Sequence, residues 1–215
     1  DMKTGRPVFN EGANREAMID TLEFLRRTVE TGIAPRAVAT ITNYNQIEPY
    51  IQADDLAMFV GGNWQINDIK RILGEEDATK WQVANIPQED PDTASTGTGG
   101  WTWGIFTDDE EKKQAAFDFF WFQLQTDNMA KISRAVGTLP TRNSVYEQVP
   151  FFSEDYYFSR FGDALEFGRP RPGVSIYNTI SEELQVAMNS ALTSDTPVED
   201  LLDQAWTTVM AEYNR

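Results

Sequence analysis

The sequence of 215 residues contains no cysteine and no histidine. Without cysteine the chain forms no disulfide bond and offers no thiolate nucleophile. Without histidine it has neither a Ser-His-Asp triad nor a histidine-ligated zinc site. These absences favour binding over catalysis, and we expect neither a metal ion nor a cofactor. They leave the cellular compartment open, because exported bacterial proteins and cytosolic proteins can both lack cysteine.

Positive charge is also scarce, since 18 Lys and Arg residues stand against 34 Asp and Glu residues, for a formal net charge of −16. This balance argues against nucleic acid as a partner, because phosphates are bound by clustered Lys and Arg. It argues equally against anionic membrane surfaces. No apolar run approaches the ~20 residues that span a bilayer, so we expect no direct insertion into a membrane. Solubility is the simplest explanation of the acidity.

The composition that remains is typical of a folded protein, with 40% hydrophobic and 12% aromatic residues. The length allows one domain or two small ones with a real core. The first residues, 1–7, are polar and do not resemble a signal segment. Because the chain begins with Asp1 instead of Met, we expect it to be processed or a piece of something longer.

Helices and strands are predicted to alternate along the chain. Apolar residues recur at helical spacing in several segments, which are residues 14–31, 44–53, 63–73, 108–124, 127–136 and 153–167 and two final helices that begin near Ile180 and Val198. Short apolar runs at Leu56–Val60, Trp81–Ile86 and Trp101–Phe106 predict strands. A loop at 87–100 marks a crossing between lobes. The pattern predicts an α/β architecture with a helical tail.

Two segments combine a strand-like run with glycines and a tryptophan: Leu56–Trp64 and Thr96–Phe106. Glycine lets the backbone turn sharply and lets a ligand approach closely. A tryptophan offers a flat apolar face with one polar N–H, which suits a sugar ring. These two platforms therefore predict a binding site for a carbohydrate.

Other motifs have simpler explanations. The glycines of Gly97–Gly100 are not followed by Lys-Ser/Thr, which excludes a phosphate-binding P-loop. The acidic runs Glu89–Asp92 and Asp108–Glu111 do not match a calcium-binding loop, so we interpret them as solvated. The remaining tryptophans are interpreted as packing residues, namely Trp81, Trp103, Trp121 and Trp206.

Five landmarks in order resemble extracellular solute-binding proteins of carbohydrate ABC importers, the maltose-binding-protein-like family. The landmarks are Ala57-Met-Phe-Val-Gly-Gly-Asn-Trp64, Gly99-Gly-Trp-Thr-Trp-Gly-Ile-Phe106, Ala115-Ala-Phe-Asp-Phe-Phe120, Gly137-Thr-Leu-Pro-Thr-Arg142, and Arg169-Pro-Arg-Pro-Gly173 with Tyr177 before two helices. They extend over most of the chain. The resemblance implies a type II periplasmic-binding-protein-like α/β fold and an extracytoplasmic location in a bacterium, in the periplasm or as a cell-surface lipoprotein.

The resemblance also implies a lobe organisation, since the chain is similar to the C-terminal half of this family. Residues 1–86 and 150–215 correspond to the C-terminal lobe, and residues 95–145 return to the N-terminal lobe. Most of the N-terminal lobe is then absent from this chain. Residues 95–145 then lack the sheet that they complete in the family, so we expect them to pack differently from the family or to pair with another copy.

By the same resemblance, a small set of residues contacts the ligand. Trp64 stacks on the sugar from the C-terminal lobe, although a core tryptophan under its helix is the alternative. Trp101 faces the ligand directly after Gly100, and Tyr177 closes on it. Arg142 either hydrogen-bonds sugar hydroxyls or pairs with one of the many carboxylates.

The function implied is the substrate-binding component of an ABC importer, which holds a sugar in an interlobe cleft without chemistry and signals to the membrane permease. A glycoside hydrolase with paired carboxylates is the main alternative. No Asp or Glu lies at the C-terminal end of the Leu56–Val60 run or of the Trp101–Phe106 run, which argues against a hydrolase. A third possibility is an interaction module whose aromatic residues bind a protein partner.

Overall fold

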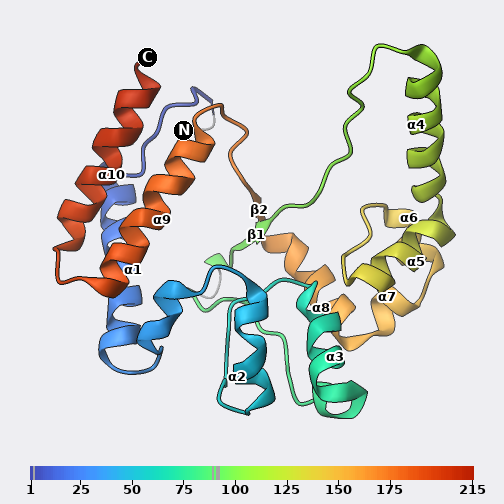
Figure 1. The fold of residues 1–215 in the computed structure, drawn as a ribbon, viewed down its shortest axis with the longest axis horizontal. Helices are drawn as coiled ribbons and strands as arrows, with labels where there is room; N and C mark the ends of the chain where they lie inside the picture. Colours follow the sequence, from blue (N-terminus) through green and yellow to red (C-terminus); the bar gives the residue numbers. More distant parts are fainter. Residues whose placement is uncertain (2, 89, 91–92) are drawn as a thin grey trace. The chain divides into compact units, whose positions relative to one another are not determined.

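The computed structural model describes residues 1, 3–88, 90 and 93–215, and the chain divides into two units (Figure 1). One unit consists of residues 1–46 and 172–215, and the other of residues 47–171. Most of the acidic run Glu89–Asp92 lies outside the described residues. The lobe assignment made from the resemblance stays a prediction.

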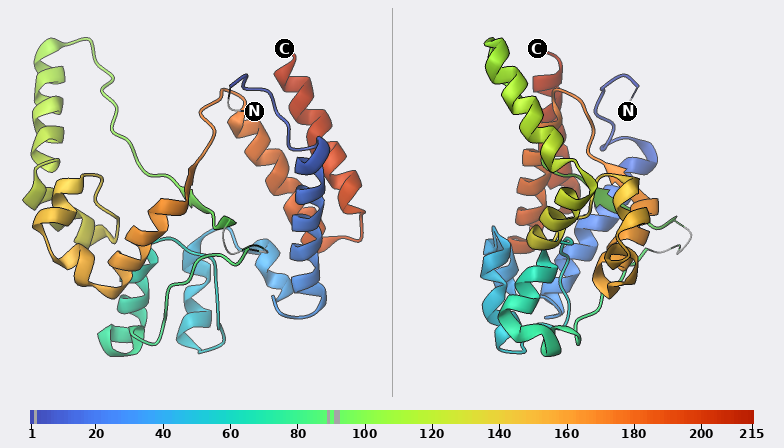
Figure 2. Two further views of the ribbon diagram at one scale, coloured as in Figure 1. Left: turned by 180° about the vertical axis from the view of Figure 1, so that it is seen from behind. Right: turned by 90° about the vertical axis from the view of Figure 1, so that its right-hand side faces the viewer.

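The unit that contains both termini is built on three long helices. Its elements are α1 (Gly12–Glu30), η1 (Arg36–Thr40), η2 (Tyr44–Gln46), α9 (Tyr177–Thr193) and α10 (Val198–Tyr213). Helices α9 and α10 lie side by side in every view, with α1 against them (Figures 1 and 2). Their shared core is made of Leu22, Ala187, Ala191, Val198, Leu201 and Ala205. The helices predicted near 14–31 and at the end of the chain are therefore confirmed, because their apolar stripes face one another.

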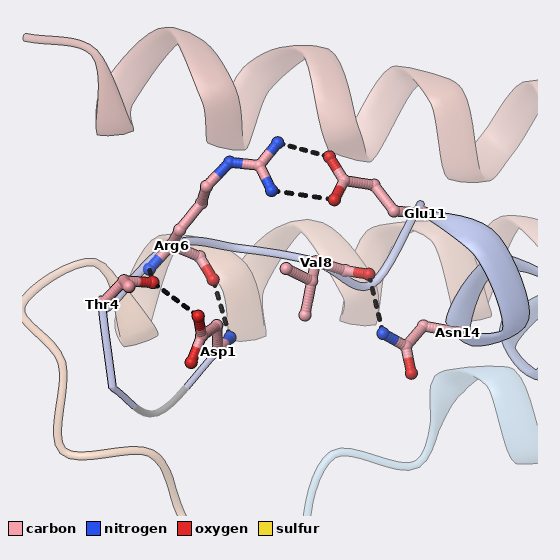
Figure 3. Close-up of polar contacts among 6 residues, drawn as sticks. All are labelled: Asp1, Thr4, Arg6, Val8, Glu11 and Asn14. Atoms are coloured by element: carbon pink, nitrogen blue, oxygen red, sulfur yellow. Dashed lines mark hydrogen bonds and ion pairs between the residues drawn. The ribbon is translucent and has the colours of Figure 1, made fainter.

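Polar contacts fix the ends of these helices. Arg26 on α1 donates to the carbonyl oxygens of Ala191 at 3.1 Å and Thr196 at 2.5 Å, which holds the turn between α9 and α10. In the N-terminal segment, the Arg6 guanidinium donates to both carboxylate oxygens of Glu11, at 2.8 and 2.5 Å (Figure 3). This pairing lowers the pKa of the Glu11 carboxyl and raises that of Arg6.

The second unit is made of shorter helices and a small sheet. Its elements are α2 (Glu48–Gln52), α3 (Gln65–Ala78), β1 (Thr96–Thr98), α4 (Glu110–Gln123), α5 (Thr126–Val136), α6 (Asn143–Gln148), α7 (Phe151–Glu154), α8 (Tyr156–Ala164), η4 (Leu165–Phe167) and β2 (Gly168–Pro170). Strands β1 and β2 pair in parallel, with Gly97 opposite Arg169. The observed fold is therefore helix-rich, with a two-stranded parallel sheet among the described residues.

The core of this unit lies where α3 meets α5 to α8. It contains the buried side chains of Ile66, Met129, Ala130, Val145, Phe152, Tyr157 and Phe158. The Tyr157 hydroxyl donates to the Ala78 carbonyl at 2.5 Å and lies 3.1 Å from that of Trp81. Burial raises the pKa of this phenol. Helix α8 is thereby attached to the end of α3.

The three strands predicted at Leu56–Val60, Trp81–Ile86 and Trp101–Phe106 do not form. A strand needs the backbone of a neighbour for its hydrogen bonds, and no described segment is paired with these runs. Several of their apolar side chains are accordingly exposed, with Met58 at 79%, whereas Phe59 and Trp81 are partly buried against a small core cluster. The α/β alternation predicted from the sequence is thus wrong for these segments, although their helical neighbours form.

Two predicted helix ends also differ in detail. Helix α3 continues past Gly74 to Ala78, with Gly74 in a non-helical conformation at φ 81°. Helix α5 begins at Thr126, one residue before the predicted range, with Gln125 as its N-cap residue. The predicted acidic start of α4 is confirmed, because the Asp109 carboxylate accepts from the backbone N–H groups of Glu111 and Lys112. Capping at that point satisfies two otherwise unpaired donors.

We expect Val209→Ala to lower the free energy of unfolding of the terminal unit by about 1.5–3 kcal/mol, because Val209 is 0% exposed and its loss leaves a cavity. Val186→Ala on α9 is the matched control, since Val186 is 61% exposed and should change stability little. Urea denaturation followed by circular dichroism measures both. Equal effects of the two substitutions would contradict the packing described.

Asp203 on α10 accepts hydrogen bonds from Asn10 and Arg15, and these contacts lower the pKa of its carboxyl. The ionised form therefore stabilises the folded state above about pH 4, and this contribution is lost as the pH falls through the lowered pKa. We expect wild type to be more stable than Asp203→Asn at pH 7, with the difference shrinking below pH 4. A difference independent of pH in urea denaturation would refute this.

Candidate functional site

Trp64 stands at the N-cap position of α3, after Gly61, Gly62 and Asn63. A Cβ on Gly62 would lie 2.2 Å from the Trp64 ring, and a Cβ on Gly61 would lie 2.7 Å from the ring of Phe59. Neither glycine has a positive φ. The two glycines therefore make room for two aromatic rings. Trp64 remains 44% exposed.

The C-terminal end of α5 is attached to the first turns of α3. The Asn63 side chain donates to the Gly137 carbonyl at 2.7 Å, and the Asn67 side chain donates to those of Arg134 at 3.2 Å and Ala135 at 3.0 Å. These bonds satisfy carbonyls that a helix end leaves unpaired. The pair at i and i+4 escaped the sequence reasoning, although its spacing places both amides on one face.

Gly137 makes this contact possible. It adopts a left-handed conformation at φ 76° as the C-cap of α5. A Cβ there would lie 3.3 Å from both the Cα and the carbonyl oxygen of Trp64. The backbone of Trp64 is therefore placed by a close approach between two helix ends that a larger residue would disturb.

Trp101 and Gly100 lie in an open segment between β1 and α4. Trp101 is 100% exposed, and a Cβ on Gly100 would meet nothing within 4 Å. Two residues on, Trp103 stacks on Phe120 of α4, with ring centroids 5.5 Å apart. It keeps 70% of its surface exposed, so the prediction that it belongs to the core is wrong. Residues 101–106 are not paired with any described strand, which explains why the Trp103 side chain is exposed.

The Arg142 side chain interacts with the C-terminal end of α4. Its guanidinium donates to the Leu124 carbonyl at 2.9 Å and lies 6.0 Å from the centre of the Trp121 ring. A cation at the C-terminal end of a helix is favoured by the helix dipole. The carboxylate pairing considered for Arg142 is not formed among the described residues, and Trp121, interpreted from sequence as a packing residue, is 53% exposed.

The other tryptophans pack as predicted. Trp206 meets Phe9 edge to face at 5.2 Å, and Trp81 meets Phe59 at 5.6 Å. Tyr177 begins α9 and belongs to the terminal unit, whereas Trp64, Gly100, Trp101 and Arg142 belong to the unit of residues 47–171. The predicted ligand contacts of all five residues stay predictions.

Hollows at two places on the described surface of the unit of residues 47–171 are lined by none of the predicted site residues. The larger, of about 320 Å³, is lined by Ile105, Glu110, Lys113, Gln114 and Phe117. The other, of about 280 Å³, is lined by Val83, Ala84, Asn85, Arg160, Asp163, Ala164 and Phe167.

The carboxyl groups whose pKa is clearly shifted are not suited to act as a general acid. Among the described residues, the carboxyl groups with a shifted pKa are Glu11 and Asp203, and both are lowered by hydrogen-bonded neighbours. A general acid of a glycosidase needs a raised pKa. Within the same residues, no group of three acidic side chains is placed to hold a metal ion. None of the described helices is long and apolar enough to cross a bilayer.

A comparison with protein families matches residues 3–157 to the model of the bacterial extracellular solute-binding proteins. The chain belongs to this family. The match includes Trp64, Trp101 and Arg142, and Tyr177 lies beyond it. Membership supports a role in binding a solute and an extracytoplasmic location for this solute-binding protein.

We expect Gly137→Ala to destabilise the unit of residues 47–171 by about 1–2 kcal/mol, because alanine is strained at φ 76° and its Cβ presses on the Trp64 backbone. Gly99→Ala is the control, since a Cβ there meets nothing within 4 Å. Thermal unfolding and tryptophan fluorescence measure both variants. If Gly99→Ala destabilised the unit as much as Gly137→Ala, the contact between α3 and α5 would not be the cause of the destabilisation.

Proposed function

We propose that this solute-binding protein binds a sugar or oligosaccharide reversibly and presents it to the permease subunits of an ABC importer. The observation that carries the proposal is the fully exposed indole of Trp101 beside the open backbone of Gly100. Aromatic faces bury the apolar side of a sugar ring, and nearby backbone groups select its hydroxyls.

Trp64 supports the same proposal from a different element. Its ring is 44% exposed at the start of α3, where the backbone N–H groups of Gln65 and Ile66 donate to the carbonyls of Gly62 and Asn63. The exposed indole offers an apolar face for a sugar ring. The contacts from Asn63 and Asn67 to the end of α5 hold this helix start in place.

We propose Arg142 as a positioning residue rather than a direct ligand contact. Its guanidinium is used by the Leu124 carbonyl and the Trp121 ring, so it orders the junction of α4 with the segments that follow. Tyr177 completes the proposed set from the start of α9.

The lobe arrangement is part of the proposal. Residues 1–86 and 150–215 form the C-terminal lobe of a type II fold, and residues 95–145 contribute to the N-terminal lobe. Trp64 and Trp101 then belong to different lobes, so a sugar held by both favours the closed form. Closure reports occupancy to the permease. The exposed aromatic residues of α4 support this assignment, because they suit a helix covered by further structure.

Titration of tryptophan fluorescence with a panel of mono- and oligosaccharides tests the sugar. We expect a saturable change with one class of saccharide, and at least about tenfold weaker binding by Trp64→Ala or Trp101→Ala, since each removes a stacking face. Phe24→Ala is the control, because Phe24 is 56% exposed on α1 of the other unit.

Product formation is assayed in the same samples. Cleavage of a saccharide would replace the proposal with a hydrolase. Saturable binding that both tryptophan variants retain would move the site elsewhere on the protein. Absence of binding to every saccharide would leave family membership standing and overturn the carbohydrate assignment.

A further inference from the structure

We draw no further inference here: the strongest candidate, the hollow of about 280 Å³ between residues 83–85 and helix α8, is lined by the exposed side chains of Asn85, Arg160 and Asp163, and nothing in the described part of the structure shows which ligand it takes.

Discussion

A β-strand satisfies its backbone through a neighbouring strand, whereas a helix satisfies most of its own. This constraint shapes the whole protein. Helices with apolar stripes find one another and form cores, as α1, α9 and α10 do. Among the described residues, one short parallel pair, β1 with β2, meets the requirement of a sheet. The other strand-like runs have no paired strand among the described residues, and many of their side chains are exposed.

The candidate site follows from contacts between helix ends. The side chains of Asn63 and Asn67 at the start of α3 donate hydrogen bonds to carbonyl groups at the end of α5. Gly137 allows the two backbones to approach closely. Trp64 is held by this junction without being buried by it. Arg142 performs a similar task at the end of α4, where it meets a carbonyl and an aromatic ring. Both junctions are built from polar side chains directed at free carbonyl oxygens.

The aromatic residues divide into two groups with different consequences. Trp81 and Trp206 pack edge to face against phenylalanines and contribute to stability. Trp101 and most of the aromatic side chains of α4 are instead exposed to solvent. The proposed function assigns the exposed face of Trp101 to a ligand.

The sequence by itself determined the long helices, because their apolar residues recur at helical spacing and water drives such a stripe to be buried. Leu22 and Val29 on α1 and Ala187 and Ala191 on α9 follow this spacing. The order of its landmarks also indicated the solute-binding family that the comparison found. Only the tertiary structure decided that the predicted strands stay unpaired, that Gly62 makes room for the Trp64 ring and that Arg142 serves α4. These outcomes depend on partners distant in sequence, and local periodicity carries no information about which partner is present.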